Sequence, residues 1–137
     1  MNLENKEKEY RSSQHLVYSC QYHVIFCTKY RRRILVQPYE EILKQLFNKI
    51  ADDYSFSILE MEVMPDHVHM LIDCHPKFGI YECVKKLKGI SAHELRENFP
   101  ELKSRVPSIW TRSSFISTVG SVSLETVKRY IENQKYV

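Results

Sequence analysis

With 137 residues, the chain is long enough for one domain with a buried core and too short for two. Hydrophobic residues make up 43% of it and charged residues 27%, which is the composition of an ordinary soluble globular domain. The formal charge is only +3, so the total charge does not by itself indicate nucleic-acid binding. The position of the cations matters more than their sum.

The cysteines and the apolar runs argue against several classes of protein. None of the four cysteines belongs to a C-x-x-C pair, so neither a zinc knuckle nor a dithiol redox motif is present. We expect reduced, packed thiols in a cytoplasmic protein. No apolar run approaches the roughly 18 residues of a membrane span, and the charged N-terminus does not resemble a signal peptide. We therefore expect no membrane partner.

The chain begins with a polar, aperiodic segment, residues 1–13, that we expect to be a flexible tail before a single domain of residues 14–137. Residues 15–28 alternate apolar and polar side chains, which predicts a long, half-buried first strand. This strand ends in a basic run around the ring of Tyr30. The cations of that run are Lys29, Arg31, Arg32 and Arg33.

A helix is predicted from Pro38, because proline suits the first helical position and an apolar stripe follows it. Residues 56–64 then predict a second strand. Its apolar face consists of Leu59, Met61 and Val63. Pro65 and Asp66 favour a turn, so the strand of residues 67–72 completes a hairpin.

Residues 80–98 have the period of a second helix, in which Gly89 is a weak point that indicates a close contact. The inward residues of this helix are Cys83, Val84, Leu87, Ile90 and Leu95, and its outward cations are Lys85, Lys86, Lys88 and Arg96. Residues 109–119 predict a last strand, which ends at residues 120–121. Ser123 then caps a final helix. The packing stripe of that helix is Leu124, Val127 and Ile131.

The order of these elements is strand, helix, strand, strand, helix, strand, helix. It predicts an α+β fold of the split βαβ type, also called ferredoxin-like or RRM-like. In this fold a four-stranded antiparallel sheet carries two helices on one face, and here a C-terminal helix bearing Tyr130 is added. The other sheet face is open in such a fold.

His67 and His69 are the first candidates for chemistry. Their spacing puts both imidazoles on one face of a strand, about 6.6 Å apart along it. Two imidazoles in this position can share one metal ion if a third ligand comes from elsewhere. The alternative is a pair of half-exposed strand histidines with no ligand role.

Tyr130 and Gln134 are spaced i, i+4, so they share one face of the final helix. A tyrosine hydroxyl can act as a covalent nucleophile, and a glutamine oxygen is a neutral ligand for a hard metal ion. Beside a metal held by two histidines, the natural target of such a tyrosine is a phosphodiester. The alternative is a packed tyrosine and a solvent-facing glutamine.

Five stretches carry a wider pattern. They are Tyr22-His23-Val24-Ile25-Phe26-Cys27 with Lys29-Tyr30-Arg31-Arg32, Met64-Pro65-Asp66-His67-Val68-His69-Met70-Leu71, Leu87-Lys88-Gly89-Ile90-Ser91-Ala92, Trp110-Thr111-Arg112-Ser113-Ser114-Phe115, and Val127-Lys128-Arg129-Tyr130-Ile131-Glu132-Asn133-Gln134. In this order, from residue 15 to the end of the chain, they resemble the HUH single-tyrosine transposases of the smallest bacterial and archaeal insertion sequences.

The resemblance implies that His67 and His69 are paired metal ligands, that Tyr130 is the nucleophile and that Gln134 takes the place of the third ligand. It implies Mg²⁺, with Mn²⁺ able to substitute, and a homodimer in which the tyrosine helix lies against the histidines of the partner subunit. The implied substrate is single-stranded DNA with hairpins in the element ends. The enzyme would cleave and rejoin this DNA through a 5′-phosphotyrosine intermediate.

Two basic clusters are expected to grip the DNA backbone. One is the run of Lys29, Arg31, Arg32 and Arg33, and the other consists of Lys85, Lys86 and Lys88. The alternative is that both are solvated charged faces. The narrow packing stripe of the final helix, after a break at residues 120–121, also favours a two-fold dimer in which each helix covers the histidines of its partner.

Other classes fit the motifs less well. A histidine-triad hydrolase needs a third histidine where Leu71 stands, and an acidic-triad nuclease needs convergent carboxylates, whereas Asp66 and Asp73 fall on opposite strand faces. Relaxases usually place the tyrosine upstream of the histidines and carry extra domains. The remaining alternative is a domesticated or non-catalytic single-stranded nucleic-acid-binding protein, since an open sheet with aromatic and arginine residues also suits that role.

Overall fold

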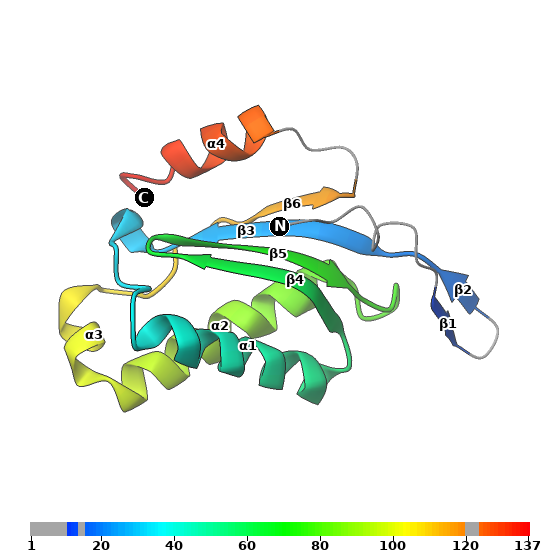
Figure 1. The fold of residues 1–137 in the computed structure, drawn as a ribbon, viewed down its shortest axis with the longest axis horizontal. Helices are drawn as coiled ribbons and strands as arrows, with labels where there is room; N and C mark the ends of the chain where they lie inside the picture. Colours follow the sequence, from blue (N-terminus) through cyan, green and yellow to red (C-terminus); the bar gives the residue numbers. More distant parts are fainter. Residues whose placement is uncertain (1–10, 14–15, 120–123) are drawn as a thin grey trace.

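The computed structural model describes residues 11–13, 16–119 and 124–137. Its centre is a four-stranded antiparallel sheet in the order β4-β5-β3-β6 (Figure 1). The strands are β3 (Gln21–Cys27), β4 (Ser57–Met64), β5 (His67–Asp73) and β6 (Phe115–Thr118). Helices α1 (Tyr39–Tyr54) and α2 (Ile80–Asn98) cover one face of this sheet, and α4 (Leu124–Glu132) lies over the other (Figure 1). The predicted α+β split βαβ fold is confirmed.

The hydrophobic core fills the space between the sheet and the pair α1 and α2. Phe26 of β3 lies at its centre, with edge-to-face contacts to Phe47 and Trp110 at centroid distances of 6.1 and 4.7 Å. Core-facing strand residues alternate with residues of the opposite face, as a pleated strand requires. Val24, Val68, Met70 and Ile72 are fully buried in this core.

The apolar face of β4 differs from the prediction because of a β-bulge. The register with β5 shifts between Ile58 and Glu60, so Ile58 pairs with Ile72 while Leu59 falls within the bulge. The extra residue of the bulge reverses the alternation of inward and outward side chains on one side of the bulge. The core face of β4 is therefore Ile58, Met61 and Val63 rather than Leu59, Met61 and Val63.

The N-terminal region is more structured than its composition suggested. Residues 11–13, assigned to the polar tail, form β1 (Arg11–Ser13), and the long first strand is divided into β2 (Leu16–Tyr18) and β3 at residues 19–20. The guanidinium of Arg11 pairs with the buried carboxylate of Asp73 at 3.2 Å and donates to Ser57 Oγ at 2.7 Å. These distant partners fix β1, and nothing in the local sequence reveals them. Residues 1–10 lie outside the described residues.

Helix α2 has the predicted bounds, but two of its residues differ from expectation. Lys88 is half-buried and directed at the segment that leads to β6, whereas it was predicted to point outward. A Cβ added at Gly89 would meet no described atom within 4 Å, so Gly89 does not mark a close contact within the described residues. Two short helices were not predicted, α3 (Pro100–Arg105) and the 3-10 turn η1 (Lys29–Arg31).

The last predicted strand, 109–119, is shorter than expected. Only Phe115–Thr118 pair with β3, and residues 109–114 form a loop that approaches β3 through an isolated bridge between Trp110 and Thr28. The carbonyl oxygens of residues 111–113 in this loop are held by Lys88 instead of by a neighbouring strand. We call residues 111–114 the Ser113 loop.

Helix α4 lies on the sheet face that carries the histidines, above β6 and β3 (Figure 1). Val127 and Ile131 of its predicted stripe are half-buried, as is Tyr130. The chain end is tied down by a hydrogen bond from the amide of Tyr30 to the carbonyl oxygen of Val137 at 2.9 Å. The predicted break at 120–121 and the cap Ser123 lie outside the described residues. Within the described residues, no helix has the length and apolarity to span a membrane.

Candidate active site

His67 is the first residue of β5, directly after the turn, and its ring is held by a carboxylate. His67 Nδ1 donates to Asp66 Oδ1 at 2.8 Å, and the other oxygen of Asp66 accepts from the guanidinium of Arg31 at 3.1 Å. Burial acts to raise the pKa of Asp66, but the bonds from His67 and Arg31 outweigh it and lower that pKa below its ordinary value. Asp66 therefore stays ionised and fixes the tautomer in which Nε2 of His67 keeps its lone pair.

His69 lies on the same face, two residues along β5. Its Nε2 is 3.5 Å from Nδ1 of His23 on the neighbouring strand, with the ring centroids 5.6 Å apart. Burial lowers the pKa of His69, and the nearby His23 lowers it further. His69 is therefore a neutral imidazole at pH 7, which is the form that binds a metal ion.

Tyr130 and Gln134 are brought together by one serine. Ser113 Oγ lies 3.0 Å from the hydroxyl of Tyr130 and 3.0 Å from Oε1 of Gln134. The serine has a single proton and the amide oxygen can only accept, so Ser113 donates to Gln134 and Tyr130 donates to Ser113. The two residues do not share a helix face as predicted, because α4 ends at Glu132 and Gln134 lies in the turn after it, yet both side chains reach Ser113. Gln134 is 8% exposed and does not face solvent.

The local surroundings keep Tyr130 protonated. Burial raises the pKa of Tyr130 above its ordinary value, while the bond to Ser113 acts in the opposite direction and the thiol of Cys27 adds to the rise. The ring packs against Phe115 of β6 at a centroid distance of 5.5 Å. The second tyrosine of this tail, Tyr136, is 83% exposed and has no such contacts with β6 or Ser113.

Lys88 anchors the loop that carries Ser113. Its ammonium group donates to the carbonyl oxygens of Thr111, Arg112 and Ser113 at 2.7, 3.3 and 2.9 Å, and to Ser114 Oγ at 3.0 Å. It also lies 5.5 Å from the centre of the Phe26 ring. Burial lowers the pKa of Lys88 to about 8. Through its hydrogen bonds, Lys88 links α2 in the core layer to the Ser113 loop, which contacts Tyr130.

The histidines and the tyrosine form two separate groups on one sheet face. Cys27 of β3 pairs in register with His67, and Ile25 with His69, while Tyr130 and Gln134 lie over β3 and β6. Among the described residues, no hydrogen bond joins Tyr130 or Gln134 to either histidine. A single chain thus places both halves of the predicted site on one face without joining them.

The predicted DNA-binding cations differ in their availability. Arg32, Arg33 and Lys85 are exposed, whereas Arg31 is paired with Asp66 and Lys88 holds the Ser113 loop. Lys86 lies over the ring of Tyr54 at 5.1 Å, and Lys29 over that of Tyr30 at 5.0 Å. Their contacts with DNA stay a prediction.

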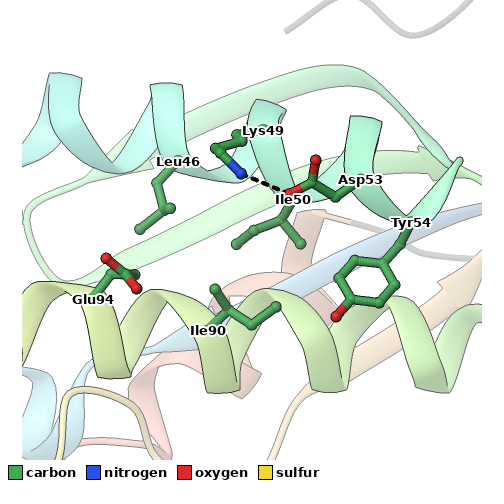
Figure 2. A pocket seen from close by; sticks show the side chains of 7 residues that line it. All are labelled: Leu46, Lys49, Ile50, Asp53, Tyr54, Ile90 and Glu94. Atoms are coloured by element: carbon green, nitrogen blue, oxygen red, sulfur yellow. Dashed lines mark hydrogen bonds and ion pairs between the residues drawn. The ribbon is translucent and has the colours of Figure 1, made fainter.

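A cavity between α1 and α2 lies away from all of these groups. Figure 2 shows its lining, with Leu46 and Ile50 on α1 facing Ile90 on α2, and an ion pair of Lys49 with Asp53 at its rim. It belongs to the helical layer on the core side of the sheet, whereas α4, which carries Tyr130, lies over the opposite side (Figure 1). We assign it no part in the chemistry.

Several residues of the site were not singled out from the sequence as site residues. Asp66 was assigned to a turn and to no site, and His23 and Ser113 were named only within the matching stretches. The position of Asp66 beside His67 gave a usable signal, because metal-binding histidines are commonly oriented by a carboxylate. Ser113 gave no such signal, because it lies 17 residues before Tyr130 in the sequence and only the fold brings the two together.

Comparison with known proteins identifies the family of the chain. Residues 16–134 match the family described as "Transposase IS200 like". The chain is 37% identical over 128 residues to the ISDra2 transposase TnpA of Deinococcus radiodurans, covering 92% of this chain and 91% of that protein. It is 31% identical over 126 residues to the transposase for insertion sequence element IS200 of Salmonella typhimurium, covering 90% and 82%.

Solved structures show the same fold. The crystal structure of a Deinococcus radiodurans R1 protein described as a transposase superposes with a TM-score of 0.85 at 35% identity, over 93% of this chain and 99% of that one. A REP-associated tyrosine transposase, bound to a REP hairpin, gives a TM-score of 0.53 at 13% identity, over 92% and 76%. Fold and site together define a tyrosine-bearing α+β transposase class. The chain belongs to the IS200-like transposase family, and the predicted family is thereby confirmed.

Proposed function

We propose that this transposase cleaves and rejoins single-stranded DNA at insertion-sequence ends, with Tyr130 as nucleophile and with His67, His69 and Gln134 as ligands of a divalent metal. The observation that carries the proposal is the serine bridge, which holds the Tyr130 hydroxyl and the Gln134 oxygen together on the sheet face of the two histidines. Ser113 itself is exposed, so this bridge places the Tyr130 hydroxyl and the Gln134 oxygen at the accessible surface of that sheet face.

The donor set fits a hard divalent ion. Asp66 leaves Nε2 of His67 with its lone pair, His69 is neutral at pH 7, and Gln134 Oε1 keeps one lone pair after accepting from Ser113. Two imidazoles and an amide oxygen leave coordination positions for phosphate oxygens. The amide and phosphate oxygens suit Mg²⁺, the ion that the family resemblance implies, and the imidazoles suit a softer ion such as Mn²⁺, which would substitute. When bound, such an ion supplies Lewis-acid polarisation of the scissile phosphate.

The chemical step asks Tyr130 to lose its proton as it attacks. A phenol is protonated at neutral pH, burial raises the pKa of Tyr130 further, and Ser113 already accepts its hydrogen bond. The bond that forms joins Tyr130 Oη to phosphorus, and the bond that breaks releases the 3′ oxygen, which takes up a proton. The products are a 5′-phosphotyrosine and a free 3′-OH. One diester replaces another, so the reverse attack by a 3′-OH rejoins the strand without ATP.

A shared site accounts for the separation of the two groups. Each α4 of a homodimer would bring Tyr130 and Gln134 to His67 and His69 of the other copy, which meets the geometric need that one chain leaves unmet. Hairpin recognition is proposed from the family resemblance. Contacts of Lys29, Arg31, Arg32, Arg33, Lys85, Lys86 and Lys88 with the DNA backbone remain part of this proposal.

The test is covalent capture of DNA. Purified protein is incubated with labelled single strands of the element ends and Mg²⁺, and the protein–DNA adduct is resolved on a denaturing gel. Tyr130→Phe should abolish the adduct and leave hairpin binding nearly unchanged, because the ring packing on Phe115 survives and only the hydroxyl is lost.

Tyr136→Phe is the matched control and should keep the adduct. A phosphotyrosine peptide that maps to Tyr136 would contradict the assignment of Tyr130. Metal-independent binding with no adduct from the unaltered protein would favour the non-catalytic single-strand-binding alternative.

A further inference from the structure

A second concave site lies on the other side of the Ser113 loop from the tyrosine. It is a cavity of about 530 Å³ between η1, the middle of α2 and the segment of residues 107–112. We call it the Gly89 cavity. Its lining residues are Lys29, Lys88, Gly89, Ala92, Pro107, Ser108, Ile109, Trp110, Thr111 and Arg112. The volume falls in the range of sites that take small molecules or single nucleotides.

The charge of this cavity is one-sided. Lys29, Lys88 and Arg112 contribute to its wall, and none of its described lining residues is acidic. The charge of these three lining cations, +3, is the same as the formal net charge of the whole chain. The ammonium of Lys88 is already bound to loop oxygens, so Lys29 and Arg112 are the cations available to an anionic ligand. The cavity therefore suits a phosphate group.

Gly89 gives an independent indication of an external ligand. Glycine is the least favourable residue after proline in a helix interior, and Gly89 lies in the middle of α2. Nothing in the described structure requires it, because its φ is not positive and an added Cβ would enter open space. Its backbone is exposed at the lip of the cavity. A helical glycine without an internal neighbour is explained by a ligand that approaches the backbone from outside.

The floor of the cavity is apolar. Trp110 is held edge-on against Phe26, its indole nitrogen donates to Ser91 Oγ at 2.9 Å, and it is 6% exposed. Ile109 is fully buried beside it, and Pro107 and Ala92 complete the apolar wall. An apolar floor beside two available cations matches a nucleobase attached to a phosphate.

We propose that the Gly89 cavity binds one nucleotide of a single-stranded DNA, with the base against Gly89, Ala92 and Pro107 and the phosphate between Lys29 and Arg112. The proposal rests on the proposed function, which supplies the single strand. The cavity is open along the exposed face of Gly89, so the neighbouring nucleotides of a continuous strand can leave it. A duplex would not fit, because its bases are paired and stacked.

Trp110 is the only tryptophan of the chain and reports directly on this cavity. Its fluorescence is followed while a mixed-sequence ten-nucleotide single strand is added without metal ion, with the matching duplex, a nucleoside monophosphate and inorganic phosphate as separate probes. The single strand should change the emission at the lowest concentration. A stronger response to the monophosphate than to the strand would overturn the assignment to a strand.

Gly89→Leu fills the cavity with a side chain. We expect the fluorescence response to disappear and the affinity for the single strand to fall about tenfold, while the melting temperature stays level or rises because leucine favours a helix. Gly89→Ala should raise the melting temperature with a smaller loss of binding. Unchanged affinity and response in a folded Gly89→Leu protein would overturn the proposal.

The cations are tested separately. Lys29→Ala with Arg112→Ala should reduce the slope of log affinity against log salt by about 1.4, since each phosphate contact to a single strand contributes about 0.7. Lys77→Ala removes an exposed cation that does not line the cavity, and it should leave the slope unchanged. Equal effects of both changes would overturn the phosphate assignment. None of these measurements needs a metal ion or Tyr130. Failure of this proposal can therefore be distinguished from failure of the proposed cleavage function.

Discussion

The two halves of the proposed active site are held in different ways. His67 and His69 belong to a central strand that pairs on both sides, and the ring of His67 is fixed through Asp66 to Arg31. Tyr130 belongs to a helix of nine residues and Gln134 to the turn that follows it. This segment rests on the sheet through half-buried side chains, one serine and the bond from the Tyr30 amide to Val137. The histidine half is therefore part of the scaffold, whereas the tyrosine half is an attachment to it.

The sharpest test of this difference mixes two inactive proteins. One carries His67→Ala and His69→Ala, and the other carries Tyr130→Phe. If sites are shared between subunits, mixed dimers contain one site with both histidines and a tyrosine, and cleavage returns from zero to a measurable fraction of the unaltered rate. The fraction is read from adduct formation on labelled element ends.

Subunit exchange must be shown in the same mixture, for example by mass or by differently tagged chains. No return of cleavage despite exchange would mean that Tyr130 acts on the histidines of its own chain. In that case α4 would have to move across β3 toward β5, since the described structure joins neither Tyr130 nor Gln134 to a histidine.

The next largest effect is expected in the histidine half alone. His67→Ala or His69→Ala should abolish cleavage and weaken metal binding, measured by calorimetry with Mn²⁺, while costing less than about 1 kcal/mol of unfolding free energy. The reason is that both rings lie on the face opposite the main core, and the side chain of His67 is 19% exposed. A large loss of melting temperature with unchanged metal affinity would show that they are only structural.

A smaller effect is expected from the serine that bridges the tyrosine half. Ser113→Ala should lower the cleavage rate about tenfold and shift its pH dependence to higher pH. The Ser113 hydroxyl can turn its proton from Gln134 to the Tyr130 phenolate as that forms, which lowers the pKa of Tyr130, and the loss of this bond lets that pKa rise. Ser113→Thr keeps a hydroxyl and should restore both. An unchanged pH profile in Ser113→Ala would limit the serine to packing.

The next prediction concerns the exposed arginines and their contact with the DNA backbone. Replacing Arg32 and Arg33 together by alanine should flatten the plot of log affinity against log salt by about 1.4, at about 0.7 for each lost phosphate contact. Arg31→Ala should instead disturb the histidine half, because its guanidinium pairs with Asp66. An unchanged salt slope in the double variant would exclude Arg32 and Arg33 from the DNA interface.

The smallest effect concerns Lys88 and stability. Its pKa is lowered to about 8 by burial, so between about pH 8 and its ordinary value of 10.5 the unfolded chain binds more protons than the folded one. The unfolding free energy should therefore rise with pH in this window relative to Lys88→Met, which cannot titrate. Urea unfolding of both proteins from pH 7 to pH 10 measures the difference. Parallel curves would show that Lys88 stays charged throughout.

The sequence was sufficient for the elements whose pattern is local. Helix α2 has the predicted bounds, and β5 was predicted to within one residue, because each shows a clean period of its own. The family could also be predicted, since its matching stretches span the chain. The position of Leu59 could not, because a β-bulge depends on the partner strand.

The parts of the site that escaped prediction depend on contacts between distant residues. Lys88 has the pattern of an outward lysine, yet the Ser113 loop supplies four oxygens for its ammonium group. Arg11 occurs in a polar run, yet it pairs with an aspartate 62 residues away. Charge-assisted bonds of this kind outweigh local preference and leave no periodic trace in the sequence.

The slight attachment of α4 has a consequence for local unfolding. Detaching this helix and the turn after it breaks few apolar contacts, the two bonds of Ser113 and the bond from the Tyr30 amide to Val137, so it costs much less free energy than melting β3 and β5. The helix can therefore come free while the sheet stays folded. For a pair of chains, exchange of the tyrosine helix is a low-barrier swap of an identical element, and the histidine scaffold persists unchanged through it.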